Sequence, residues 1–190
     1  MLELQKRFGP TMKQHLSLFF AVLFITLITG CEQKPLAPLP TVTHVDLQRY
    51  SGLWHEIARY ENRFEAGCVG ATATYTLEKD HVKVVNRCYG EDGKLSDRAE
   101  GRAYVVEGSG NAKLRVSFFR PFYGDYWIIM LADDYRYSVV GDPQRKYLWI
   151  LARGTVLSDE DREVISGRLV ALGYDPLRLY WTGFKGMCNH

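Results

Sequence analysis

The sequence has no excess of charge of either sign. It contains 24 Lys and Arg against 22 Asp and Glu, and the two totals become equal once residues 1–30 are removed. A protein that binds nucleic acid needs a basic stripe to neutralise the phosphates, and no such stripe is present. The composition therefore argues against a nucleic-acid partner.

Motifs for metal binding and catalysis are also missing. The five histidines are scattered along the chain, which contains neither His-Glu-x-x-His nor Cys-x-x-Cys. Cys188 and a distant histidine do not make a convincing nucleophilic pair, because nothing in the sequence orients the base. We therefore predict no metal site, no cofactor and no catalytic residue, and expect that the protein is not an enzyme.

The N-terminal segment lacks a hydrophobic run long enough to cross a bilayer as a permanent helix. Its apolar run, residues 16–28, has 13 residues, whereas a membrane span needs about 20. The run follows Lys13 and ends in Thr29-Gly30-Cys31, the small residues that a signal peptidase requires before a cysteine. Residues 1–30 are therefore interpreted as a lipoprotein signal peptide, with Met12 as an alternative start, and Cys31 as the lipidation site.

Residues 31–44 are interpreted as a Pro-rich tether. Its Pro-rich part, residues 34–40, should be extended, at about 3.1 Å per residue, and poorly packed. Several acyl chains on Cys31 give stable attachment where one chain is marginal. Glu32 follows, and because an aspartate at this position often marks retention at the inner membrane in similar lipoproteins, its absence favours the outer membrane.

Residues 45–190 are enough for one domain and show many short strands at regular spacing, which is typical of an all-β sandwich or an up-and-down barrel. A helical turn is expected at residues 45–50. The expected strands are residues 52–60, 69–77, 81–88, 98–106, 113–119, 125–132, 136–141, 147–153 and 179–182.

One helix is expected before the last strand. Ser158 begins a capping box, acidic residues occupy the first turn, and Gly173 suits the C-terminal end. Ile165, Leu169 and Leu172 lie on one stripe, which we expect to pack against the outside of a barrel.

Five motifs precede this helix in a fixed order. They are Gly-Leu-Trp at 52–54, Thr-Ala-Thr-Tyr at 72–75, Val-Val-Asn-Arg at 84–87, Phe-Phe-Arg-Pro-Phe-Tyr-Gly at 118–124 and Tyr-Leu-Trp-Ile-Leu-Ala-Arg at 147–153. Together they resemble the lipocalin family, specifically its bacterial outer-membrane lipoproteins, over roughly residues 45–184. The resemblance implies an all-β fold, an eight-stranded antiparallel up-and-down barrel with one C-terminal helix packed outside.

Three residues are expected to build the closed end of this barrel. Gly52 permits a tight turn, and the ring of Trp54 seals the interior. The resemblance places Arg153 against that ring, where a cation over an indole contributes about 0.5–2 kcal/mol. Glu56 shares the face of Trp54 and is expected inside the barrel, paired with a cation near the floor.

The remaining cysteines predict one disulfide. A hairpin centred on Lys79 would place Cys68 directly opposite Cys88, at the Cα separation that a disulfide requires. The rival pairing joins Cys68 to Cys188, since some animal lipocalins tie the second strand to the C-terminal tail. Either pairing leaves one thiol over.

The barrel interior is predicted to hold a ligand. Small residues at 99, 101 and 103 face inward and leave room, and the alternation in 113–119 points Leu114, Val116 and Phe118 inward. Tyr123 is expected in a loop at the mouth and Trp149 above the floor. The candidate ligand-binding residues are Tyr123, Trp149, Phe118, Val116, Leu114, Tyr60, Tyr75 and Tyr126.

The resemblance implies the ligand class. We expect a membrane-anchored protein that binds and stores or transports a fatty acid or lysophospholipid at the outer membrane of a Gram-negative bacterium, on the periplasmic side; a homodimer is a further expectation. Two alternatives stay open. An enzyme acting on a lipophilic substrate would need converging titratable groups in the cavity, and a scaffold lipoprotein with a filled barrel would need large side chains at 99, 101 and 103.

The lipidation site gives a direct prediction. Cys31→Ser removes the thiol that is acylated before cleavage, so the variant should accumulate as an uncleaved precursor, seen as a mass increase in whole-protein mass spectrometry. Cys188→Ser is the matched control and should be processed normally. A Cys31→Ser protein that is cleaved and still sediments with membranes would contradict the lipoprotein assignment.

Overall fold

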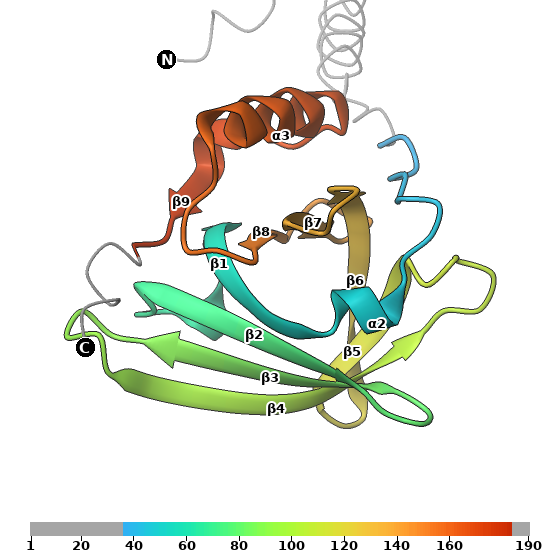
Figure 1. Ribbon diagram of the computed structural model, residues 1–190, viewed down its shortest axis with the longest axis horizontal. Coiled ribbons are helices and arrows are strands. Elements are labelled where there is room, and N and C mark those ends of the chain that lie inside the picture. The colour runs from blue at the N-terminus through green and yellow to red at the C-terminus, as the bar shows by residue number, and fades with distance from the viewer. Residues whose placement is uncertain (1–35, 184–190) are drawn as a thin grey trace, which may run out of the picture. The chain divides into compact units, whose positions relative to one another are not determined.

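The computed structural model describes residues 36–183, which contain nine strands and four short or regular helices (Figure 1). In chain order these are α2 (Leu47–Tyr50), β1 (Gly52–Tyr60), η1 (Arg63–Glu65), β2 (Gly70–Leu77), β3 (Val82–Tyr89), β4 (Leu95–Val105), β5 (Lys113–Phe119), β6 (Phe122–Leu131), β7 (Tyr137–Gly141), β8 (Leu148–Ala152), α3 (Asp159–Ala171), η2 (Pro176–Arg178) and β9 (Leu179–Trp181). Residues 1–30, Cys31 and Cys188 lie outside the described residues. None of the helices within 36–183 is both long and apolar enough to span a bilayer.

Eight strands close into an antiparallel up-and-down barrel. Each of β2 to β7 pairs with the next strand in the chain, β8 pairs with β1, and β1 pairs back with β2 from Gly52↔Tyr75 to His55↔Thr72. β9 pairs only with the far end of β1, where Ala58 faces Trp181. The fold predicted from the sequence is therefore confirmed, including the external helix.

A β-bulge divides β1 into two halves. The register of β1 against β8 shifts between Glu56 and Ala58, and such an extra residue reverses which side chains face inward. Before the bulge, Trp54 and Glu56 face the interior. After the bulge, Arg59 faces the same side and forms an ion pair with Glu56, whereas Tyr60 faces outward.

The closed end is built around Trp54, which has no exposed surface. Its indole Nε1 donates to the backbone oxygen of Tyr50 at 2.8 Å, so it is tied to the C-terminal residue of α2. The guanidinium carbon of Arg153 lies 3.9 Å from the centroid of the Trp54 ring, on the solvent side. Gly52 has φ +99°, a conformation that only glycine adopts without strain.

The helix α3 lies outside the barrel (Figure 1), and a second hydrophobic layer fills the space between its buried face and the strands. Alternate residues of the same strand serve the two layers: in β8, Leu151 packs inside the barrel and Ile150 packs outside. The helix is capped by Ser158, whose hydroxyl accepts from the backbone nitrogen of Asp161 at 3.1 Å. As predicted, its stripe of Ile165, Leu169 and Leu172 is buried in the outer layer.

The described part of the Pro-rich tether, residues 36–44, is packed against the barrel, so the expectation of a poorly packed segment is wrong. Leu39 is only 3% exposed and belongs to the outer hydrophobic layer. The backbone nitrogen of Val42 donates to the backbone oxygen of Ile128 at 3.0 Å, and Nη2 of Arg145 donates to the backbone oxygen of Ala37 at 2.8 Å. Side-chain burial and backbone pairing thus outweigh the extended tendency of proline.

Cys68 and Cys88 form the disulfide, which confirms that pairing over Cys68 with Cys188. The predicted strand register is wrong, however. Ala71, and not Cys68, faces Cys88 in the ladder of β2 and β3. Cys68 lies just before β2, so the bond fastens the loop between β1 and β2 to β3.

Truncation of Trp54 should destabilise the protein strongly. We expect Trp54→Ala to cost about 3–5 kcal/mol of unfolding free energy, because a fully buried aromatic side chain and its contact with Arg153 are both lost. Urea unfolding measures this. Trp181→Ala removes a 41% exposed indole and is the matched control, with a much smaller loss expected. Equal effects of the two substitutions would contradict the role given to Trp54.

Candidate functional site: the barrel cavity

The barrel encloses a cavity of about 830 Å³. Seven of the eight predicted ligand-binding residues line it, namely Leu114, Val116, Phe118, Tyr123, Tyr126, Tyr75 and Trp149. Small and aliphatic side chains from β2, β3 and β4, such as Ala73, Val84 and Ala103, also contribute to the wall. The interior is therefore hollow, in contrast to the filled barrel that was one alternative.

Tyr60 is the exception, and its assignment to the cavity is wrong. Its hydroxyl accepts from the backbone nitrogen of Asp175 at 2.7 Å, and its ring meets Tyr174 edge-on in the outer layer. The bulge between Glu56 and Ala58 explains the error, because it reverses the inward and outward faces of β1 before Tyr60 is reached.

Aromatic side chains from β5 and β6 surround one end of the cavity. Phe118 and Tyr123 are 43% and 40% exposed, and Phe119 and Phe122 extend further into solvent. Tyr123 lies within strand β6 and not in a loop, as the sequence had suggested. The Phe118 ring occupies the space that a side chain at position 101 would fill, since a Cβ at Gly101 would lie 2.8 Å from that ring.

Four hydroxyl groups form a chain at the closed end of the cavity. Tyr50 bonds to Ser138 and to Tyr126, and Tyr126 bonds in turn to Tyr75, each at 2.9 Å. Burial raises the pKa of Tyr50 to about 12 and also raises the pKa values of Tyr75 and Tyr126, so all three phenols are neutral. The sequence had suggested Tyr75 and Tyr126 but gave no sign of Tyr50 or Ser138.

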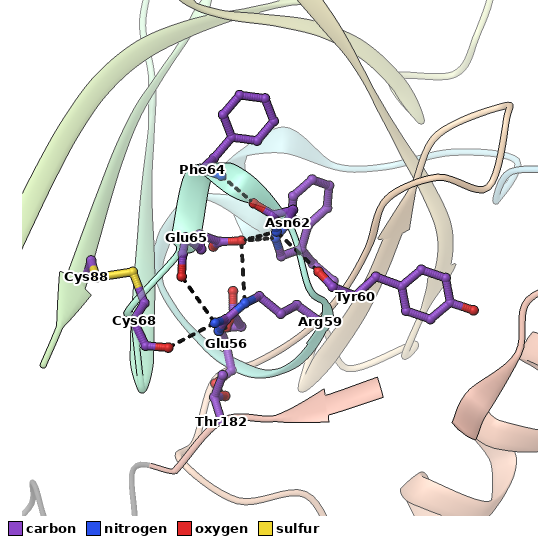
Figure 2. Close-up of polar contacts among 10 residues, drawn as sticks. Glu56, Arg59, Tyr60, Asn62, Phe64, Glu65, Cys68, Cys88 and Thr182 are labelled. Atoms are coloured by element: carbon purple, nitrogen blue, oxygen red, sulfur yellow. Dashed lines mark hydrogen bonds and ion pairs between the residues drawn. A yellow bond between two sulfur atoms is a disulfide. The ribbon is translucent and has the colours of Figure 1, made fainter. Parts of the chain in front are cut away.

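A charged cluster lies on the side of the cavity next to the loop of residues 61–69 (Figure 2). Arg59 Nη1 donates to Glu56 Oε1 at 2.6 Å, with both side chains buried. Arg59 Nη2 also donates to the backbone oxygen of Cys68 at 2.9 Å, and Nε lies 3.8 Å from Glu65 Oε2. The cation that pairs with Glu56 is thus Arg59 beside this loop and not a group at the floor.

Glu65 extends this cluster to β8, the strand paired with β1. Its Oε2 accepts from Asn62 Nδ2 at 2.6 Å and from Trp149 Nε1 at 3.0 Å. The loop containing η1 is therefore fixed to both β1 and β8, and Phe64 of η1 lines the cavity. Arg59 and Glu65 were not suggested by the sequence, because the bulge that turns Arg59 inward leaves no pattern in the residues.

Comparison with known proteins places this barrel in a family. A family model described as a lipocalin-like domain matches residues 45–183. The sequence is 38% identical over 168 residues to the outer membrane lipoprotein Blc of Citrobacter freundii, covering 87% of this chain and 95% of that protein. The chain belongs to the lipocalin family. Members of this family bind small hydrophobic ligands.

More distant relatives agree with this assignment. This lipocalin is 32% identical over 155 residues to apolipoprotein D of Macaca fascicularis, covering 75% of this chain and 79% of that protein. Among solved structures, insecticyanin from the tobacco hornworm Manduca sexta is similar with a TM-score of 0.65 at 20% identity, covering 79% of this chain and 86% of that one. At that identity the similarity shows the shared fold.

The charged cluster makes stability depend on pH. Burial, followed by the neighbouring Glu65 carboxylate, raises the pKa of Glu56 above its ordinary value of 4.5, although Arg59 opposes the shift. Between pH 4.5 and the raised value, the folded state holds a proton that the unfolded state has lost. Stability contributed by Glu56 therefore falls as the pH rises through this window.

Glu56→Gln should remove this loss while keeping an oxygen for Arg59. We expect the unfolding free energy of the variant relative to the parent protein to increase as the pH rises from 4.5, measured by urea unfolding between pH 3 and 8. Glu100→Gln is the control: Lys83 and Arg98 lower the pKa of Glu100, so its trend should be opposite in sign and lie below pH 4.5. A Glu56→Gln difference that does not vary with pH would contradict this account.

Proposed function

We propose that this lipocalin binds one amphiphilic lipid, a fatty acid or a lysophospholipid, and stores or transports it at the outer membrane of a Gram-negative bacterium. The cavity of about 830 Å³ carries the proposal. Its volume is within the range of small-molecule sites, and its walls are mainly apolar, as an acyl chain requires.

The ends of the cavity support an amphiphile over a wholly apolar ligand. Arg63, Arg87 and Gln144 contribute polar groups to the lining, and the cations among them suit a carboxylate or a phosphate. The half-exposed Tyr123 offers a hydroxyl beside an apolar ring. We therefore place the head group among these residues and the acyl chain along Val116, Leu114 and the inner barrel.

Binding is proposed in preference to catalysis. Among the carboxylates that line the cavity, Glu56 and Glu65 are engaged by Arg59, Asn62 and Trp149. They hold the loop of residues 61–69 in place and thereby shape the cavity wall. An enzyme would need titratable groups directed at the ligand.

Membrane attachment completes the proposal. The bacterial relatives named as outer membrane lipoproteins support acylation at Cys31 and an outer-membrane location. Attachment on the periplasmic side and a homodimer stay predictions, which protease protection in intact cells and analytical ultracentrifugation would test.

Affinity should increase with acyl chain length and then level off. Each buried methylene contributes about 0.8 kcal/mol, or about fourfold in Kd, until the cavity is full. A saturated lysophospholipid series, titrated by the change in Trp149 fluorescence with Trp127 and Trp181 replaced by Phe, measures this increase.

Val116→Trp should narrow the cavity and move the plateau to shorter chains. Val164→Trp, at a 52% exposed position on α3, is the matched control and should leave the plateau unchanged. Affinity that does not depend on chain length, or a plateau that Val116→Trp does not shift, would place the ligand elsewhere.

A further inference from the structure

The hydroxyl chain at the closed end carries one more hydroxyl proton than its internal hydrogen bonds require. Ser138, Tyr50, Tyr126 and Tyr75 supply four O–H groups, and three hydrogen bonds join them. Each bond consumes one proton, so one O–H always remains to donate outside the chain. Within residues 36–183, no other side-chain or backbone oxygen is hydrogen-bonded to any of these four hydroxyls.

The position of the hydroxyl chain directs its spare proton into the cavity, where a ligand would lie. Tyr50, Tyr75 and Tyr126 line the cavity, whereas Ser138 does not and has no exposed surface. A spare proton on Ser138 would be buried without a partner, which is costly. The favourable arrangements therefore place it on one of the three tyrosines, facing the cavity.

The surroundings make an unfilled hydrogen bond costly here. Apolar residues such as Val82, Val84, Leu114 and Leu151 belong to the same buried cluster as Tyr50 and Tyr75. A ligand that ends in a methyl group would displace water from the spare O–H and offer nothing in return. A ligand that carries an oxygen acceptor at this depth would satisfy it, in surroundings of low dielectric where hydrogen bonds are strong.

We propose that the closed end of the cavity is a hydrogen-bonding subsite for an oxygen acceptor, such as a ketone or ester carbonyl, near the buried end of the ligand. The inference rests on the proposed function, since it specifies which amphiphiles the same cavity prefers. It assigns Tyr50, Tyr75 and Tyr126 as the donors. Arg63 and Tyr123 serve the opposite, head-group end.

The binding of matched lipid pairs to the full-length protein in phospholipid nanodiscs tests the proposal. Each pair has one chain length and differs by a single ketone oxygen next to the terminal methyl group, and protein-free nanodiscs give the partition background. The ketone should bind about tenfold tighter at the length that brings it to the tyrosines. At shorter lengths it should bind more weakly than its partner, because a buried carbonyl without a donor is unfavourable.

Variants distinguish the hydroxyl chain from general polarity. Any single Tyr→Phe change at 50, 75 or 126 leaves a hydroxyl group with a spare proton in the cavity, so the ketone preference should survive. The triple variant Tyr50→Phe, Tyr75→Phe, Tyr126→Phe removes every such donor and should abolish it. Ser138→Ala and Tyr147→Phe, a lining tyrosine outside the chain, are controls that should keep the preference.

A spectroscopic measurement on the unmodified protein keeps the test independent of how the triple variant folds. The infrared stretch of a ¹³C-labelled ketone should shift to lower frequency when bound, and an unshifted band would overturn the subsite. If the unmodified lipids bind with chain-length dependence but the ketone is weaker at every length, the subsite fails and the proposed function stands. If neither lipid of any pair binds, both fail.

Discussion

The contact between Arg153 and Trp54 is the point on which the rest of the barrel depends. The guanidinium covers the outer face of the indole at 3.9 Å, donates to the backbone oxygens of Leu53 and Arg49, and so joins the end of β8 to β1 and α2. Trp54 in turn holds Tyr50. One stacked pair therefore closes the barrel and positions Tyr50, whose hydroxyl is part of the hydroxyl chain above it.

Closing one end allows the other to stay hollow. A barrel that reserves its interior for a ligand forgoes core contacts there, and in this protein the outer face of the barrel supplies them instead. Leu169 of α3 and Leu39 of the N-terminal segment pack on strands whose inner faces line the cavity. The disulfide and the Arg59 cluster then hold the loop of residues 61–69 without filling the cavity.

Features that follow from local pattern could be predicted from the sequence. The alternation that turns Leu114 and Val116 inward and the stripe on α3 depend on periods of two and 3.6 residues, and Gly52 before Trp54 follows from the backbone freedom of glycine. The β-bulge in β1 breaks that period, and no residue type in the strand indicates its presence. The alternation therefore predicted Tyr60 in the cavity and missed Arg59. The packing of Leu39 was likewise hidden, since proline content describes the isolated chain and not the surface that it meets.

We propose that this lipocalin carries a single amphiphile inside its barrel. Native mass spectrometry of the protein, extracted gently from the cells that produce it, tests this most directly. We expect an added mass equal to one fatty acid or one lysophospholipid for each chain, lost when the ligand is displaced. A protein that shows no added ligand mass, and that also binds no lipid when lysophospholipid is added, would contradict the account.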